Sequence, residues 1–402
     1  MSSVLAKPNS AVEKFLTGLK AGEARLPVDW EQWLAIGAPY AETGVTRKEV
    51  TTRFARNGYD WDMHGSLFLP GKEHPSGICF VMFHGGAGSE NIFDRTPDGR
   101  PGLGRVLAAQ GFPALALTYV GHWSPKPNGN WDTPVPERQP IYLLDRDLPA
   151  EEILDRNLKC TFNVHMQGAA ALADQHFAGR KVLAFGHSTG GPMAALLHRV
   201  AKKIDILGIC GFGSGGPDGW RRQWRLETGS EKTTEHPVEK VSRRSPSTFK
   251  ASGYEDPPDL CPWGGADQYI AWAQRIRSQM KTSLCDNQHM GNLEMLEQYV
   301  QRTGLPLEEY FDHLVDPDPA WLKKASVLLV VGDNDRGHWL HGDKIENKRE
   351  PWMVAKYRAM GARKAAVAVI ARYGHVGYCE LHNEKIAYLW LWAQMSGYFD
   401  AS

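Results

Sequence analysis

Short apolar runs recur along the chain, and most are separated by segments in which apolar residues recur with helical spacing. A strand that is buried on both faces of a sheet reads as a continuous apolar run. Such strands are typical of a parallel sheet, in which helices connect one strand to the next. The sequence therefore predicts an α/β fold. The predicted strands are 49–54, 66–69, 78–83, 114–118, 182–185, 206–210, 327–331 and 366–370.

Outside residues 213–319, three segments carry apolar residues at spacings i, i+3, i+4 and i+7, the pattern of one apolar helix face. These stripes are Val12, Phe15, Leu16 and Leu19; Met193, Leu196, Leu197 and Val200; and Ile386, Leu389, Trp390 and Ala393. A signal peptide would carry an uninterrupted apolar run in the N-terminal segment, but this segment carries the first stripe instead. No segment is apolar over the length of a membrane span. We therefore expect a cytoplasmic protein that has no membrane partner.

The charges are balanced, with 46 Lys and Arg against 46 Asp and Glu, and no block of like charge stands out. Such a chain has no electrostatic footprint for binding nucleic acid. The six cysteines are scattered, and several fall inside apolar runs. We expect them to be mostly reduced, and their spacing fits no zinc site.

One long stretch interrupts the alternation of strands and helices. Residues 213–319 show no convincing strand, are rich in Trp and Pro, and carry a helical stripe at Tyr269, Trp272, Ala273 and Ile276. More than 100 residues is too long for a loop without structure, so we predict an inserted, largely helical cap. The expected organisation is a helical extension (1–48), a core in two parts (49–212 and 321–402) and a cap (213–320). Residues 121–149 are expected to form a long ordered loop beside the site.

The strongest chemical signal is the segment 182–191, in which an apolar run leads into Gly186-His187-Ser188-Thr189-Gly190-Gly191 and then into a helical pattern. A G-x-S-x-G turn between a strand and a helix presents a nucleophilic serine above the edge of a sheet. The turn is so tight that Ser188 should have strained backbone angles, and side chains at 186 and 190 would collide with the backbone. Ser188 is the predicted nucleophile.

A second glycine-rich turn, His84-Gly85-Gly86, follows the predicted strand 78–83. An acyl-transfer site needs two donors for the oxyanion of its tetrahedral intermediate. We predict that the backbone N–H of Thr189 is one donor, and that Gly86 or Ala87 supplies the other.

The third and fourth signals are a pair of acids and a histidine, each following a predicted strand. Asp333 and Asp335 follow strand 327–331, and His375 lies between strand 366–370 and the last helical stripe. A serine nucleophile needs a histidine base and a carboxylate that orients it. Asp335 is the predicted acid, with Asp333 or a carboxylate after the strand 206–210, such as Asp218, as alternatives.

The ordered set HGG (84–86), GHSTG (186–190), GDND (332–335) and GHVG (374–377) resembles the α/β-hydrolase superfamily over about residues 49–212 and 325–396. This resemblance implies an eight-stranded, mostly parallel sheet and a catalytic triad of Ser188, His375 and Asp335. The turn of strand, Gly, two residues and Asp is similar to the acid turn of the superfamily. The cap and the first 45 residues lie outside the resemblance.

These signals predict a serine hydrolase that cleaves an ester or lactone of a small, mostly apolar molecule through an acyl-enzyme, without a cofactor. A C–C bond hydrolase of β-diketone-like substrates, or a non-catalytic small-molecule binding protein, would use the same residues. His84, His187, His122 and Trp123 are candidate substrate contacts. Five acidic and histidine residues lie close together in the sequence, namely Asp333, Asp335, His338, His341 and Asp343. Their spacing fits no standard metal site, so no metal is expected. A homodimer is the commonest assembly for such enzymes.

Overall fold

The computed structural model describes residues 8–37, 44–85, 90–120, 149–188, 190–213, 259–265, 268, 301–306, 309, 322, 325–335 and 352–400. Within these residues, nine strands form one sheet in the order β1-β9-β8-β7-β6-β4-β5-β3-β2. All neighbours are parallel except the antiparallel pairs β2–β3 and β3–β5. The strands are β1 (Arg25–Val28), β2 (Thr46–Arg56), β3 (Tyr59–Leu69), β4 (Cys79–Phe83), β5 (Ala114–Thr118), β6 (Lys181–His187), β7 (Asp205–Phe212), β8 (Ser326–Gly332) and β9 (Lys364–Ile370).

The predicted α/β fold is confirmed, but the described sheet has one strand more than the eight we expected. Strands β2 to β9 match the eight predicted runs, and β1 lies in the extension for which only helix was expected. β1 has four residues, contains Pro27 and pairs with β9 alone. A proline is compatible with an edge strand because the free side of that strand needs no ladder hydrogen bond, but it weakens the strand signal in the sequence.

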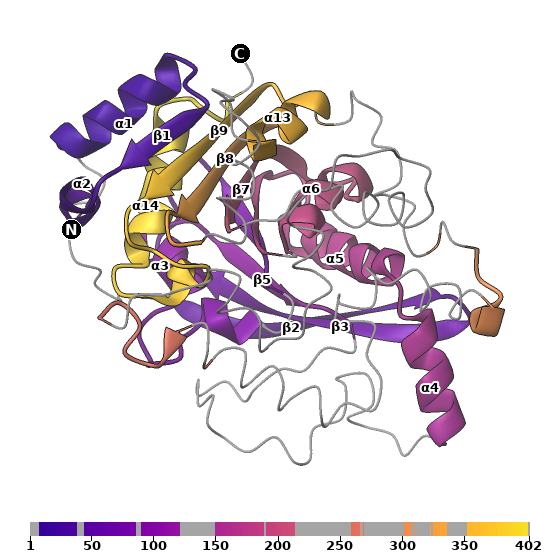
Figure 1. The fold of residues 1–402 in the computed structure, drawn as a ribbon. Coiled ribbons are helices and arrows are strands. Elements are labelled where there is room, and N and C mark those ends of the chain that lie inside the picture. Colours follow the sequence, from indigo (N-terminus) through magenta and orange to yellow (C-terminus); the bar gives the residue numbers. More distant parts are fainter. Residues whose placement is uncertain are drawn as a thin grey trace.

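Helices cover both faces of the sheet (Figure 1). Helices α1, α2, α3 and α14 contribute to one core cluster, and α5, α6 and α13 contribute to the other. Consecutive strand residues alternate between the clusters, as Phe80 and Val81 do, because side chains alternate across a pleated strand. The helices are α1 (Ser10–Lys20), α2 (Trp30–Ala35), α3 (Leu103–Ala109), α4 (Ala150–Lys159), α5 (Phe162–Phe177), α6 (Gly190–Val200), α13 (Trp352–Ala359) and α14 (Glu384–Met395), with short 3₁₀ helices η1 (Glu90–Phe93) and η6 (Gly377–Cys379).

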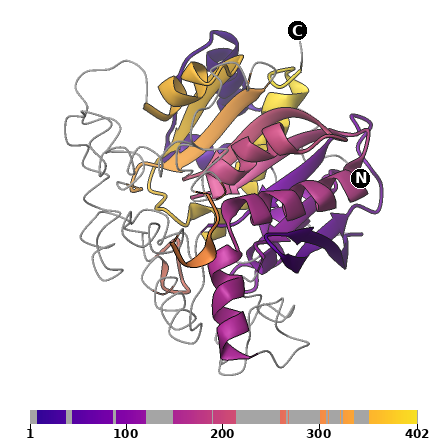
Figure 2. The same ribbon diagram turned by 90° about the vertical axis from the view of Figure 1, so that its right-hand side faces the viewer.

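The three helices predicted from the apolar stripes are present as α1, α6 and α14, although α14 is buried on all sides from Lys385 to Gln394. Figure 2 shows that α4, by contrast, extends away from the sheet. No helix in the described part of the chain is long and apolar enough to cross a bilayer.

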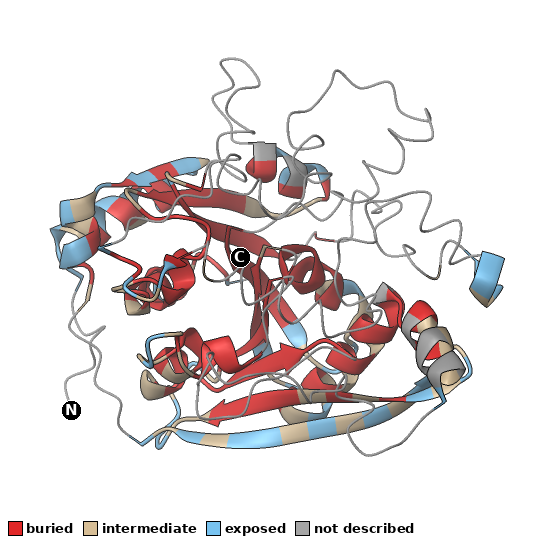
Figure 3. Ribbon diagram, turned by 60° about the horizontal axis from the view of Figure 1, so that its bottom comes forward, coloured by how far each residue is buried: buried red, intermediate tan, exposed pale blue. Residues whose placement is uncertain are grey.

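The long β2–β3 hairpin turns at Asn57 and Gly58, whose φ angles are 52° and 80°. Two successive positive φ angles define the turn that best matches the twist of paired strands, and Asn-Gly is its preferred sequence. β2 forms the outer edge and is mostly exposed or half-buried, whereas the inner strands are buried (Figure 3). The hairpin is longer than its apolar runs because polar residues occupy its exposed positions.

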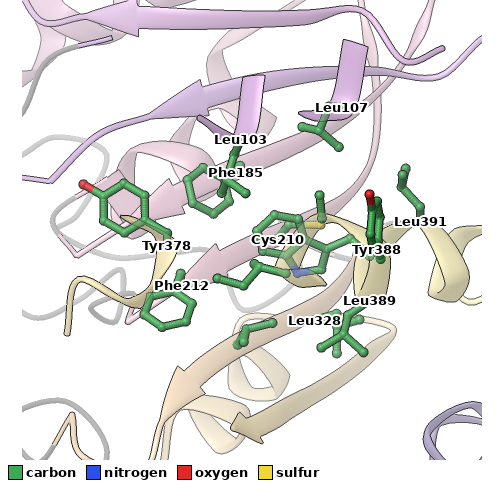
Figure 4. Close-up of a cluster of buried hydrophobic side chains, with 14 of the residues drawn as sticks. Leu103, Leu107, Phe185, Cys210, Phe212, Leu328, Tyr378, Tyr388, Leu389 and Leu391 are labelled. Carbon is green, nitrogen blue, oxygen red and sulfur yellow. The ribbon is translucent and has the colours of Figure 1, made fainter. Parts of the chain in front are cut away.

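Aromatic and aliphatic side chains pack densely between the sheet and the helices α3 and α14 (Figure 4). Cys210 lies within this cluster, and burial raises the pKa of its thiol well above the ordinary value. The five described cysteines, Cys79, Cys160, Cys210, Cys261 and Cys379, are all buried and free of disulfides, as expected. Cys285 lies outside the described residues.

The described parts of the predicted cap contact the core at two places. Near one end, the carbonyl of Leu260 accepts from the N–H of Leu381 at 2.9 Å, next to η6. Near the other end, the Glu309 carboxylate forms a bidentate ion pair with the Arg56 guanidinium, with N–O distances of 2.6 and 2.7 Å. It also accepts a hydrogen bond from the side-chain amide of Asn57 at 2.9 Å. Burial opposes ionisation of Glu309, but these hydrogen bonds outweigh it and lower the pKa of its carboxyl. The helical stripe 269–276 falls outside the described residues.

Candidate active site

Ser188 lies in the turn that joins β6 to α6. Its φ angle is 50°, a left-handed conformation that is strained for a residue with a side chain. The N–H of Ser188 donates to the carbonyl of Phe212 at the end of β7, at 3.4 Å, and its carbonyl accepts from the N–H of Gly191 at 3.0 Å. The predicted strain at Ser188 is therefore confirmed, and the residue stands at the N-terminus of α6.

The two glycines that flank this turn are required by backbone contacts. A Cβ atom at Gly186 would lie 2.1 Å from the carbonyl oxygen of Gly190. A Cβ atom at Gly190 would lie 2.4 Å from the carbonyl oxygen of Phe83, the last residue of β4. Real Cβ atoms do not approach backbone this closely, so the prediction that side chains at 186 and 190 would collide with the backbone is confirmed.

The end of β4 lies against the serine turn. A Cβ atom at Gly85 would meet the Nδ1 atom of His187 at 2.5 Å and the Cβ atom of Ser188 at 3.3 Å. The glycine-rich turn after β4 therefore begins in contact with the predicted nucleophile, where an oxyanion donor is needed. The predicted donors themselves, Gly86, Ala87 and Thr189, lie outside the described residues.

Asp335 and His375 come together from the loops that follow β8 and β9. The Nδ1 atom of His375 lies 2.9 Å from Oδ2 of Asp335, a carboxylate with no exposed surface. His375 is also buried, with 8% of its surface exposed. A hydrogen bond to a buried carboxylate fixes the ring orientation and places the proton on Nδ1, which leaves Nε2 to act as a base.

Asp333, the alternative acid, has a different contact. Its carboxylate accepts from the backbone N–H of Arg372 at 2.6 Å and is exposed. This bond stabilises Arg372, whose φ angle is 71°, so the described role of Asp333 is to cap a strained turn. Asp218, the other alternative, lies outside the described residues.

Two further contacts hold the loop that carries His375. The N–H of Asn334 donates to the carbonyl of Tyr373 at 3.0 Å, so the acid turn and the histidine loop are joined through backbone. The buried carboxylate of Glu380 accepts from the N–H of Gly374 at 3.0 Å. Glu380 was not predicted from the sequence, because its contact with Gly374 lies within a loop and follows no helix or strand pattern.

Gly213 connects the serine turn with the acid–histidine pair. It follows Phe212, whose carbonyl accepts from Ser188, and its φ angle is 52°. A Cβ atom on Gly213 would lie 2.8 Å from Oδ2 of Asp335 and 3.1 Å from Nδ1 of His375. Backbone at this position therefore packs directly on the hydrogen-bonded pair. The only sequence signal for this role is a glycine at the end of a strand.

The two candidate substrate contacts that the structure describes are both buried. Nδ1 of His84 donates to the carbonyl of Gly85 at 2.7 Å, and the carbonyl of His84 accepts from the hydroxyl of Tyr119 at 2.7 Å. His187 contacts the histidine loop through the carbonyl of His375. Contact of either side chain with substrate stays a prediction, and His122 and Trp123 lie outside the described residues.

The described residues contain no group of three or more His, Cys, Asp or Glu side chains that could hold a metal ion. Of the acidic and histidine cluster weighed in the sequence, Asp333 and Asp335 are described and have the separate partners given above. His338, His341 and Asp343 lie outside the described residues.

Comparison with known proteins gives one family. The model of the alpha/beta hydrolase family matches residues 80–387. No curated protein matches the sequence. Among solved structures, the chain is similar to MenH from S. aureus (12% identity, TM-score 0.44, covering 83% of this chain and 98% of that one). It is also similar to the proline iminopeptidase-related protein from Thermus thermophilus (13% identity, TM-score 0.46, covering 86% of this chain and 98% of that one). A third similar structure is the proline iminopeptidase of Mycobacterium smegmatis (14% identity, TM-score 0.41, covering 87% of this chain and 99% of that one).

Proposed function

We propose that this chain, which belongs to the alpha/beta hydrolase family, is a serine hydrolase that cleaves a carboxylic ester or lactone through an acyl-enzyme. Ser188 is the proposed nucleophile, His375 the general base and Asp335 the orienting acid. The proposed substrate is a small, mostly apolar molecule, an inference that rests on the many aromatic residues of the insertion.

The observation that carries this proposal is the buried hydrogen bond between His375 and Asp335, next to a serine in a strained turn. A histidine and an aspartate without a catalytic role would gain little stability from being buried together, because removing a carboxylate from water costs free energy. Burial of such a pair is what a general base requires, since the carboxylate stabilises the imidazolium that forms during proton transfer.

The proposed reaction begins when Nε2 of His375 removes the proton of the Ser188 hydroxyl as its oxygen attacks the carbonyl carbon. The oxyanion is stabilised by backbone N–H groups of Thr189 and the turn after Gly85. His375 then donates the proton to the leaving alcohol oxygen, and the acyl group remains on Ser188. Water, deprotonated by His375, releases the acid and restores the serine.

The first test is intact-mass spectrometry after incubation with a fluorophosphonate, which labels activated serines. We expect one adduct on the wild-type protein and none on Ser188→Ala, while circular dichroism shows that both proteins are folded. A folded wild-type protein that forms no adduct, or a Ser188→Ala variant that still does, would contradict the proposal.

Turnover then identifies the bond. Aryl esters, lactones and β-diketones of increasing size should be tested with the wild-type protein and with Ser188→Ala. We expect hydrolysis of esters or lactones that disappears in the variant. Turnover of diketones alone would replace the ester assignment by C–C bond hydrolysis with the same residues.

A further inference from the structure

His187 lies between the turn after β4 and the loop after β9. It is the last residue of β6, directly before Ser188, and only 1% of its surface is exposed. A histidine buried to this extent loses its hydration, so its ring contacts must be specific. These contacts reach the loop after β9 and the turn after β4.

The first contact joins His187 to the backbone of the proposed general base. Nε2 of His187 lies 3.0 Å from the carbonyl oxygen of His375. A carbonyl only accepts, so Nε2 of His187 carries the proton and donates. The residue before the nucleophile is therefore bonded to the main chain of the base, across 188 positions of sequence.

The remaining contacts hold the His187 ring in place. Its centroid lies 4.1 Å from that of Tyr378 and 4.9 Å from that of the His375 ring. On another side, the Gly85 backbone is so close that a Cβ atom there would come within 2.5 Å of Nδ1. The ring is thus wedged between the histidine loop and the first residues of the predicted oxyanion turn.

Two anchors together determine where the His375 imidazole lies. Asp335 holds the ring at Nδ1, and His187 holds the carbonyl of the same residue. The ring could still pivot about Nδ1 if its backbone moved, and Nε2 would then shift relative to Ser188. Catalytic groups must be held within about 0.5 Å of productive geometry, so the backbone anchor matters for the rate.

We propose that His187 is a positioning residue, whose hydrogen bond to the His375 carbonyl sets the base in register with the adjacent Ser188. This proposal rests on the proposed function, and it differs from the substrate contact predicted for His187 from the sequence. Because His187 precedes Ser188 in the chain, its side chain links the nucleophile turn to the backbone of the proposed base.

The test uses two substitutions with opposite expectations. His187→Gln keeps an N–H donor near the position of Nε2, whereas His187→Leu fills the space without a donor. His165→Leu is the matched control, because His165 is equally buried at 1% and accepts a backbone hydrogen bond from Val120 at 3.1 Å. It has no described contact with His375.

For an ester that the wild type hydrolyses, we expect His187→Leu to lower kcat by about 10- to 100-fold, since small misplacements of catalytic groups have effects of this size. KM should stay within about twofold, because the substrate is not contacted. His187→Gln should recover most of kcat, and His165→Leu should keep it after correction for the folded fraction. An increase in KM alone in His187→Leu would overturn the proposal in favour of substrate contact.

Hydrogen exchange supplies a readout that needs no activity. We expect peptides that span residues 371–380 to exchange faster in His187→Leu than in the wild type, and His187→Gln to restore protection. If the wild-type protein proves inert, the proposed function fails, but this exchange result still decides whether His187 anchors the loop. Unchanged exchange in His187→Leu would overturn the proposal.

Discussion

The serine turn and the acid–histidine pair lie side by side, yet they are built in different ways. The turn is determined by backbone contacts, since only glycine fits at positions 186 and 190, where the chain closes on itself. The pair is determined by side-chain contacts between residues 40 positions apart, and its partners are carried on separate loops. Steric exclusion therefore fixes the turn of the proposed nucleophile, whereas hydrogen bonds fix the proposed base.

The largest effect should follow from Gly186→Ala, which disturbs the serine turn, the part of the site that backbone contacts determine. The new Cβ atom would lie 2.1 Å from the Gly190 carbonyl oxygen, with no flexible side chain to yield. We expect a loss of more than about 3 kcal/mol in the free energy of unfolding, or failure to fold, measured by chemical denaturation.

Gly71→Ala is the matched control, because its closest backbone contact would be 3.1 Å, to the carbonyl oxygen of Gly44. It should cost about 1 kcal/mol or less. A Gly186→Ala protein with wild-type stability and normal fluorophosphonate labelling would show that the turn tolerates a side chain after all.

Asp335→Asn tests the side-chain-determined part of the site. An amide has nearly the shape of the carboxylate, so the protein should fold, but the charge that stabilises the imidazolium is gone. We expect kcat to fall by about 10³- to 10⁴-fold, measured with an ester that the wild type hydrolyses. Asp333→Asn should change kcat little, because Asp333 bonds to backbone. Equal losses in the two variants would reject Asp335 as the acid.

Gly213→Ala distinguishes the two parts of the site most directly. Its Cβ atom would press on Oδ2 of Asp335 at 2.8 Å, and its φ angle of 52° adds strain. The serine turn keeps its own glycines. We expect kcat to fall by about 10- to 100-fold, with a loss of stability of about 1–3 kcal/mol. A variant that loses stability but keeps the wild-type kcat would show that the pair is held more firmly than its contacts suggest.

The same difference explains what the sequence could predict. Ser188 could be predicted as the nucleophile because strand, glycines and helix are all local signals, and the strain observed at its φ angle followed from them. The sequence favoured Asp335 but left Asp333 as an alternative, since their contacts depend on what the loop after β9 places opposite each. Glu380 and Gly213 gave no usable signal, because their roles arise from contacts formed only in the folded chain. The edge strand β1 was missed for the same reason, as its partner is β9 at the other end of the sequence.

The smallest effect on catalysis is expected at Glu309, where the insertion meets the turn of the β2–β3 hairpin. The pKa of Glu309 is lowered in the folded protein, so its ionised form stabilises the fold above the ordinary value of 4.5, and this contribution is lost as pH falls through the folded pKa. Glu309→Gln should therefore cost about 1–3 kcal/mol at neutral pH, and the gap to the wild type should narrow in acid. Denaturation at several pH values measures this gap. Unchanged kcat in the variant would show that stability can fall without disturbing the acid–histidine pair, whereas a loss of kcat comparable to that of Gly213→Ala would mean that the insertion also positions the base.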